Sequence, residues 1–216
     1  MLPISSSTWK ELVQLGKRCT ESGWAEEGIF APAIGPNYTP GSKNSILFVG
    51  KSAGPLGGNV GSSSYLRSSI LASTEWMLQR HNKRGFWVVP DEIDKHRRQF
   101  AWTNVCKIDQ KGKSAPPQGA YWDLVRQPCL NALRDEIFTL KPMTIVFLIS
   151  NTYQFDCIDL MYNLGYEEEF QINGAQFNSI FLRNGDFKCV FTKHPQGWSV
   201  EDRAPVIRFI RERYSS

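Results

Sequence analysis

The apolar stretch MTIVFLI, which spans Met143–Ile149, decides how this chain folds. A short apolar run without polar alternation is typical of a strand that is buried on both faces of a sheet. Before it, Tyr121–Leu140 has the apolar spacing of a helix, and Pro142 ends that helix. After it, Tyr153–Leu164 predicts a second helix, which Gly165 ends. A buried strand between two helices is characteristic of an α/β domain.

Other strands are predicted on both sides of this unit. Ser45–Val49 and Phe100–Lys107 are apolar runs of the same kind. Asn178–Leu182 and Phe187–Thr192 flank an Asn-Gly pair within Arg183–Asp186, which is a strong hairpin signal. The pattern predicts an α/β fold with three α/β/α layers and a central, mostly parallel sheet of about four strands plus a C-terminal hairpin strand. At 216 residues the chain is predicted to be a single domain, residues 1–216.

Three more helices are predicted. Thr8–Ser22 has helical spacing, and Thr8 with Glu11 forms a capping-box pattern. A second helix is expected from about Ser63 to Gln79, and Val200–Tyr214 predicts a closing helix with apolar residues on one face and arginines on the other. The intervening segment 23–43 is rich in proline and glycine and predicts a long loop.

The charge of the chain permits a nucleic-acid partner without requiring one. The formal net charge is +4, and a basic protein of this kind suits polyanions when its basic residues cluster. Each cluster taken alone is better explained as a solvated face of the protein. The clusters are residues 81–84, residues 95–98 and the arginines Arg203, Arg208, Arg211 and Arg213.

The cysteines and the N-terminus indicate the compartment. The chain has five widely spaced cysteines and no Cys-x-x-Cys pair, which favours free, mostly buried thiols over a disulfide framework. We see no secretory signal and no apolar run long enough for a membrane span, so we expect a cytoplasmic protein with no membrane partner. Without a partner motif we expect a monomer.

Two loops are expected at the carboxyl ends of strands, where open α/β sheets bind their ligands. Residues 50–61 hold five glycines in twelve positions between a strand and a helix, which indicates close backbone approach to a ligand. They match neither the Walker A nor the Gly-x-Gly-x-x-Gly pattern. Lys193–Ser199 (KHPQGWS) follows the last strand and combines an imidazole, a proline, a glycine and an indole. The alternative is that the histidine only joins a strand to a helix.

The order of motifs resembles the uracil-DNA glycosylase superfamily, in particular its iron–sulfur branch. That branch has Gly-Glu-Ala-Pro-Gly and then Gly-x-x-Phe-Val-Gly after its first strand, where this chain has Gly50–Gly54 and Gly57–Gly61. The branch continues with Thr-Asn-Val-Val-Lys, matched by Thr103–Lys107. Its active site ends in His-Pro-Ser-Pro-Leu-Ser, matched by His194–Ser199. Leu140–Pro142, ahead of the apolar strand, also fits the family pattern.

The chain departs from that branch at the iron–sulfur cluster. Such clusters are held by four cysteine thiolates. Cys19 and Cys129 match two ligand positions, but Ser22 and Ile108 occupy the other two. We therefore expect no cluster, no metal and no other cofactor.

The chain also departs from the family in the base pocket. The aromatic residue that stacks on uracil corresponds to Asn59, and the acid of the first motif is replaced by Lys51. Ser52 stands where other branches carry a water-activating Asp or Asn. The resemblance thus implies a pocket that is altered from a standard uracil site, with Asn59, Lys51 and Asn104 as base-binding residues.

The resemblance implies a role for each remaining residue. His194 would stabilise the charge on the leaving base, and Ser52 and Asp109 are the other catalytic candidates, with Asp109 a substitute for positioning water. Trp198 stands where the family has an intercalating leucine and would fill the space of the flipped base. Asn104, Trp198 and Asp109 each have an alternative structural explanation, as a turn former, a core residue and a loop residue. The other DNA contacts are expected from Gly50, Gly54, Lys107, Gln196, Gly197 and Ser199.

The first functional hypothesis is a monofunctional DNA glycosylase that hydrolyses the N-glycosidic bond of an abnormal base and leaves an abasic site. Because Asn59 would open the pocket, a modified or bulky pyrimidine is the favoured base, in repair or in defence against modified foreign DNA. The second hypothesis is a catalytically silent nucleic-acid- or nucleotide-binding protein of the same fold. A third is a hydrolase of free nucleosides or nucleotides, which needs no DNA groove. Fold alone does not decide between them.

Overall fold

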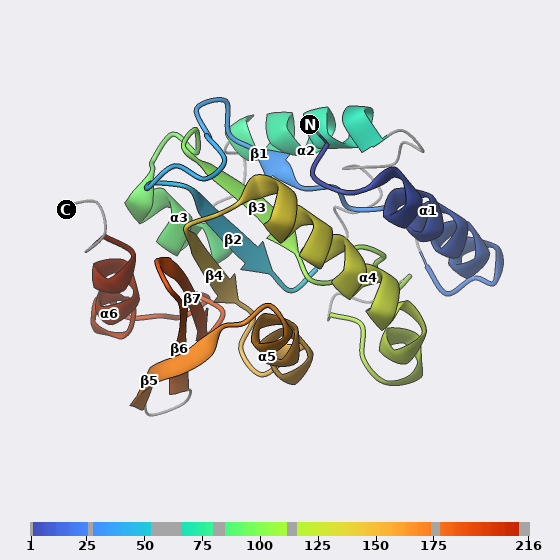
Figure 1. Cartoon of the computed structure of the whole chain (residues 1–216). Coiled ribbons are helices and arrows are strands. Elements are labelled where there is room, and N and C mark those ends of the chain that lie inside the picture. The colour runs from blue at the N-terminus through green and yellow to red at the C-terminus, as the bar shows by residue number, and fades with distance from the viewer. Residues whose placement is uncertain are drawn as a thin grey trace.

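The computed structural model describes residues 2–25, 28–52, 66–79, 85–111, 116–173 and 178–211. Within these ranges a seven-stranded sheet lies between two layers of helices (Figure 1). The strands are β1 (Ala33–Ile34), β2 (Ile46–Gly50), β3 (Phe100–Asn104), β4 (Thr144–Leu148), β5 (Glu167–Asn173), β6 (Asn178–Asn184) and β7 (Phe187–Thr192). The helices are α1 (Ser6–Glu21), α2 (Leu66–Gln79), α3 (Val88–Ile93), α4 (Gly119–Leu140), α5 (Gln154–Asn163) and α6 (Val200–Arg211), with a 3-10 turn, η2, at Gly85–Trp87.

The centre of the sheet is parallel. The strand order is β1-β3-β2-β4-β7-β6-β5, and β3, β2, β4 and β7 run in the same direction. Every residue of β2, β3 and β4 is buried, as their apolar sequences predict. The predicted three-layer α/β fold with a mostly parallel sheet is therefore confirmed.

The sheet has more strands than we predicted. The strand β1 is two residues long and pairs with β3 inside the segment expected to be a loop. The edge strand β5 pairs with β6 and begins with three glutamates. Polar residues are typical of an edge strand, because charge there discourages pairing with another chain. The expected number of about four strands plus a hairpin strand was too low for this reason.

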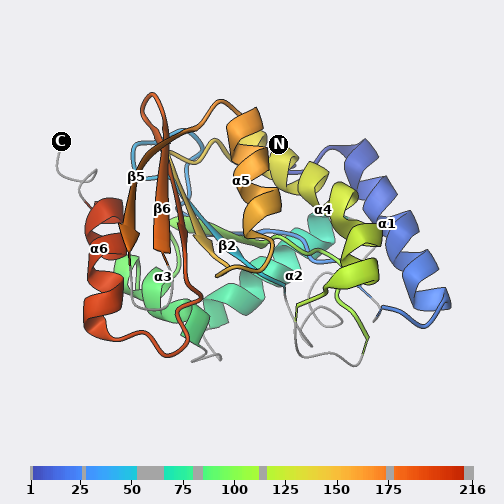
Figure 2. The same ribbon diagram turned by 90° about the horizontal axis from the view of Figure 1, so that it is seen from below.

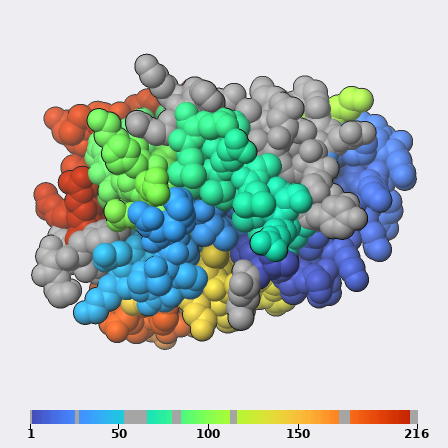
Figure 3. Space-filling model, turned by 90° about the horizontal axis from the view of Figure 1, so that it is seen from above, coloured from blue at the N-terminus to red at the C-terminus, as the bar shows by residue number. Residues whose placement is uncertain are grey.

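Alternate residues of each central strand face different helix layers. Leu47, Val49 and Ile145 belong to the core beneath α1, α4 and α5. Phe48 and Val146 belong to the core beneath α2, α3 and α6. Figure 2 shows the two layers on opposite sides of the sheet, and Figure 3 shows α2 and α3 on one surface with α6 beside α3.

The first helix is capped one turn earlier than predicted. Ser5 is its N-cap, and its hydroxyl accepts a hydrogen bond from the Thr8 N–H at 3.2 Å. The Thr8 hydroxyl instead donates to the Asp135 carboxylate at 2.7 Å, which ties α1 to α4. Thr8 is thus a link between helices, and the predicted cap at this residue was wrong.

All five cysteines are buried free thiols, as predicted. Among the helices in the described ranges, none combines the length and the apolar character needed to cross a bilayer.

Candidate functional site

The carboxyl ends of the four parallel strands meet at one edge of the sheet. Gly50 of β2 lies opposite Asn104 of β3, and Leu148 of β4 lies opposite Thr192 of β7. Because Val49 pairs with Phe147, the four ends are level with one another. The residues that follow these strands therefore gather at one place, which is where this class of sheet binds ligands.

Asn104 and Gly50 form the floor of this edge. The Asn104 side chain is 2% exposed and lies directly over the Gly50 Cα, so that a Cβ at position 50 would collide with its Oδ1. Such a Cβ would also stand 3.1 Å from the Phe86 ring. The Asn104 Nδ2 makes no hydrogen bond within the described part of the chain. A buried amide donor left unpaired costs about 1–3 kcal/mol, so its orientation requires a reason.

His194 stands at the same edge as a neutral hydrogen-bond donor. Its main-chain N–H donates to the Ser150 hydroxyl at 2.9 Å, and its Nδ1 accepts a long hydrogen bond of 3.4 Å from the Gln196 N–H. Burial, and then the nearby positive charge of Lys51, lower the pKa of His194 from its usual value to about 4. At neutral pH the ring is uncharged, and because Nδ1 accepts, the hydrogen is on Nε2.

Lys51 supplies a positive charge beside this ring. Its side chain is half-buried, and burial lowers its pKa from the ordinary lysine value. Within the described ranges no carboxylate forms an ion pair with it. The Lys51 carbonyl accepts from the Cys106 N–H at 2.9 Å, and the Gly50 carbonyl accepts from the Val105 N–H at 2.9 Å. These bonds extend the β2–β3 pairing and fix the start of the glycine-rich loop; Ser52 follows, half-buried.

Replacing Lys51 with glutamine should raise the pKa of His194. Removal of the neighbouring positive charge makes protonation of the imidazole less costly, whereas the larger effect of burial stays in place. We expect a pKa that rises from about 4 but stays below the usual value, measured by NMR titration of the histidine ring protons. The matched control is Lys17→Gln on α1, an exposed lysine on the other face of the sheet, which should leave this pKa unchanged. An unchanged pKa in Lys51→Gln would show that the two side chains are not close.

Replacing Gly50 with alanine should displace the Asn104 side chain. Because Cβ would collide with Oδ1, we expect destabilisation of about 1–3 kcal/mol by thermal unfolding and the loss of any activity that uses this amide. The double variant Gly50→Ala with Asn104→Ala removes the closer obstruction, the Asn104 Oδ1, and leaves only the Phe86 ring, which has to shift slightly. It should recover most of the stability and none of the activity, and a double variant as unstable as the single one would contradict this geometry.

Two comparisons with known proteins bear on the resemblance. No protein-family model matches the chain, and no curated protein matches it. The resemblance to uracil-DNA glycosylases is thus a prediction from motifs alone.

Trp198 lies in the core, as the structural alternative for this residue predicts. It is 9% exposed and packs in the core beneath α3 and α6, so the indole does not project as a wedge. Its main-chain N–H closes a turn on the Pro195 carbonyl at 3.1 Å. Gly197 adopts a left-handed φ of 79° in that turn, and Gln196 and Gly197 are exposed. Insertion of Trp198 into DNA stays a prediction, and it would require the ring to leave its packing beneath α6.

Ser199 caps the last helix. Its hydroxyl accepts from the Asp202 N–H at 3.1 Å, and its own N–H donates to the Asp202 carboxylate at 3.1 Å. The side chain that we expected to contact DNA therefore stabilises the start of α6.

Lys107 and Asp109 both contact helix α4. The Lys107 side chain is 0% exposed, and its ammonium contacts both carboxylate oxygens of Glu136, at 2.7 and 2.8 Å. The predicted DNA contact would require the ammonium to leave this pair. Asp109 is buried, and its carbonyl accepts from the Tyr121 hydroxyl at 3.3 Å. This places Asp109 against α4, in the opposite helix layer from Trp198. The two remaining predicted residues, Gly54 and Asn59, lie outside the described residues.

Sequence reasoning missed Ser150, which holds the start of the loop Lys193–Ser199 in place. Ser150 has a left-handed φ of 53°, which is uncommon for serine, and strain of this kind is concentrated at functional sites. Its hydroxyl accepts from His194, and its N–H donates to the Thr192 carbonyl at 3.1 Å. The available signal was a serine directly after a buried parallel strand, at the ligand-binding edge.

The turn η2 was also missed, because three residues give no periodic signal. It brings Phe86 to the site, with its ring centroid 6.2 Å from that of His194. Gly85 packs against the main chain of Gln196, where a Cβ would stand 2.6 Å from the Gln196 Cα. The turn therefore supports the loop that carries His194.

A hollow of about 380 Å³ lies between the start of α4 and the loop after β4. Its walls include Asn151, the tilted ring pair Trp122 and Tyr153, with centroids 4.0 Å apart, and Phe155, which is 82% exposed. Flat aromatic walls of this kind suit a planar ring. Among the described residues, no group of three or more His, Cys, Asp or Glu side chains is placed to hold a metal ion.

Proposed function

We propose that the protein is a monofunctional DNA glycosylase that removes an abnormal base and leaves an abasic site. The observation that carries the proposal is the meeting of three groups at one sheet edge: the neutral His194 ring, the Asn104 amide, whose Nδ2 has no partner among the described residues, and the Lys51 ammonium. All three donate hydrogen bonds, so the edge is built to receive an electron-rich, planar group. The motif resemblance supports a base as that group.

The chemistry needs stabilisation of the departing base more than it needs a strong catalytic base. When the C1′–N bond breaks, its electron pair goes to the base and the sugar becomes an oxocarbenium-like cation. The His194 Nε2–H can donate to the base oxygen on which negative charge develops, and the Lys51 charge favours the same state. Water then adds to C1′ and releases a proton to solvent, and the proton on the released base comes from solvent as well.

Asn104 supports recognition of the base edge. A buried side-chain amide can present both a donor and an acceptor, and a ligand would satisfy the Nδ2 that is otherwise unpaired. Ser52 follows Lys51 directly and is the residue we propose to hold the water. The preference for a modified or bulky pyrimidine rests on Asn59, in repair or in defence against modified foreign DNA.

Purified protein incubated with a panel of DNAs tests the proposal. The panel holds uracil-containing DNA, deaminated-purine DNA, and genomic DNA with hydroxymethylated or glucosylated cytosine, each treated with alkali to reveal abasic sites as strand breaks. Cleavage of one class that is lost in His194→Ala would support a glycosylase and would identify its substrate. Intact DNA throughout the panel would reject it.

Two other functions remain as candidates. One is a catalytically silent nucleic-acid- or nucleotide-binding protein, and the other is a hydrolase of free nucleosides or nucleotides. One observation favours both of these functions over a glycosylase: Trp198 is buried in the core, so the described residues lack the wedge that a base-flipping enzyme is expected to carry. Tight DNA binding without base release would support a silent protein. Release of base from free nucleosides, but not from DNA, would support the hydrolase.

A further inference from the structure

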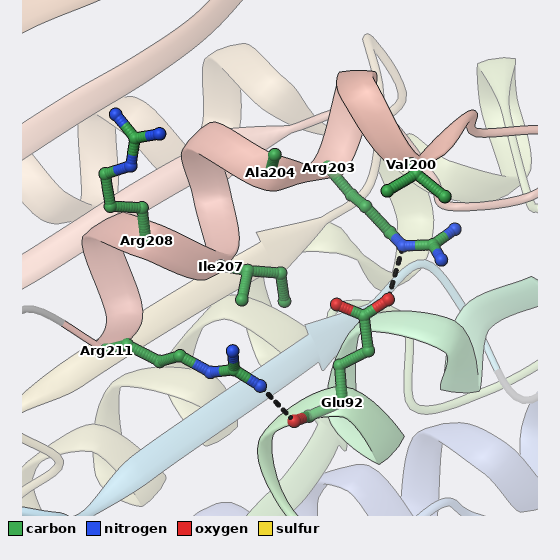
Figure 4. A pocket seen from close by; sticks show the side chains of 7 residues that line it. All are labelled: Glu92, Val200, Arg203, Ala204, Ile207, Arg208 and Arg211. Carbon is green, nitrogen blue, oxygen red and sulfur yellow. Dashed lines mark hydrogen bonds and ion pairs between the residues drawn. The ribbon is translucent and has the colours of Figure 1, made fainter.

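A groove of about 440 Å³ runs between α3 and α6, on the helix layer that also carries Trp198. Three arginines, Arg203, Arg208 and Arg211, line it with a single acid, Glu92 (Figure 4). Ile207 lies between them and gives the groove an apolar floor. Three positive charges against one negative charge make the lining a site for an anionic partner.

Glu92 holds two of these arginines in place. Its carboxylate accepts from the Arg203 Nε at 2.5 Å, and its main-chain carbonyl accepts from an Arg211 terminal nitrogen at 2.8 Å. Each guanidinium keeps further N–H groups that these bonds do not use. Arg208 is exposed and extends away from Glu92, and it forms no ion pair within the described ranges (Figure 4). The groove thus presents two positioned guanidinium groups and one that is not paired.

The acidic residues of α6 lie outside the lining of the groove. Glu201 and Asp202 lie in the first turn, and the Asp202 carboxylate is already used to cap the helix at Ser199. The basic residues follow over the remaining turns. From Arg203 to Arg211 the helix advances about 12 Å, a length over which one strand of B-form DNA carries roughly three to four phosphates.

Both walls of the groove begin at the candidate site. Helix α6 follows the loop that carries His194, and α3 follows the turn η2, whose Phe86 faces the His194 ring. Gly85 of the same turn packs on Gln196. The groove therefore leads away from the place where a base would be bound, along two elements that start there.

We propose that the α3–α6 groove binds the phosphate backbone of the DNA strand that leaves the sheet edge at which His194 lies. This inference rests on the proposed function, because it assumes a DNA partner. Guanidinium groups bind phosphate oxygens in pairs of parallel hydrogen bonds, and Ile207 offers an apolar surface to a sugar. A polyanion fits the spacing of the arginines along one helix, and the link to the site selects DNA over an acidic peptide.

The experiment measures the affinity of the full chain for a labelled 30-base-pair duplex between 50 and 200 mM salt, in the wild type and in Arg208→Gln with Arg211→Gln. Each lost phosphate contact lowers the salt slope by about 0.9 for duplex DNA, so the expected decrease is about 1.8. Over this fourfold salt range the wild type should lose about 12-fold more affinity than the variant. The matched control, Lys17→Gln with Arg134→Gln, removes the same charge from exposed positions of α1 and α4, on the opposite layer, and should keep the wild-type slope.

A wild-type slope in the arginine variant would overturn the groove proposal. A second test uses Arg208 alone, because this residue is exposed and its substitution should not disturb folding. Arg208→Glu should weaken duplex binding further than Arg208→Gln. Competition by polyglutamate, with the duplex slope unaffected by the arginine substitutions, would assign the groove to an acidic peptide and reject DNA. A wild-type protein that binds no duplex would remove the DNA partner itself, whereas base release with an unchanged slope would reject only the groove.

Discussion

Replacing His194 with alanine should lower the rate of base release about 10²–10³-fold and change the affinity for DNA by less than about threefold. The rate falls because one positioned donor to a developing negative charge is lost, and donors of this kind contribute on this scale. The affinity should persist because in the proposed complex the ring would touch the base and not the phosphates, which supply most of the binding free energy. Single-turnover release from the cleaved substrate and a separate binding titration measure the two quantities.

The matched control is His96→Ala. His96 is an exposed histidine beyond α3, so its loss should change neither the rate nor the affinity by more than about twofold. Equal losses of rate and affinity in His194→Ala would assign His194 to binding and would remove the basis of the proposed chemistry.

Because the pKa of His194 is about 4, the rate of base release should also be constant from pH 6 to pH 8 and change only as the ring takes up a proton near pH 4.

The sequence was sufficient to predict the parallel centre of the sheet. In β2, β3 and β4 the local apolar pattern and the final burial agree, because both faces of these strands are covered by helices. It was insufficient for β1 and β5. A two-residue strand has no measurable period, and the β5 sequence EEEFQIN is too polar for a rule that expects buried strands. Edge strands are set by their neighbours and not by their own composition.

In the candidate site, too, some features could be predicted from the sequence and others could not. The positions of His194, Asn104 and Lys51 follow from the rule that parallel strands end at one edge, so motif reasoning brought them together correctly. The orientation of Lys107 and Trp198 depends on partners that are distant in the sequence. Lys107 pairs with a glutamate 29 residues away on α4, and Trp198 packs against helices that its own loop does not reveal. A motif gives the position of a residue along a strand but not the direction of its side chain.

The second large predicted effect is the loss of stability when the buried ion pair of Lys107 and Glu136 is broken. Both side chains are 0% exposed, and the ammonium also donates to the Thr103 hydroxyl, so the charge has no access to water. In Glu136→Gln the ammonium would remain buried without its counter-charge, which typically costs about 3–5 kcal/mol. For a chain of this size the midpoint of thermal unfolding should fall by roughly 6–20 °C. Asp123→Asn, at an exposed acid of the same helix, is the control and should change the stability by less than about 0.5 kcal/mol.

Removing both charges together separates the structural role of Lys107 from a role in DNA binding. Lys107→Met with Glu136→Leu leaves no unpaired charge, so it should be far more stable than Glu136→Gln and close to the wild type. If Lys107 served only the fold, the salt slope of duplex binding in this double variant would equal the wild-type slope. A decrease of about 1 would mean that Lys107 leaves Glu136 to contact a phosphate when DNA binds, because each phosphate contact contributes about that much to the slope. We expect no decrease, since Lys107 would have to break two hydrogen bonds to a buried carboxylate and leave that carboxylate unpaired.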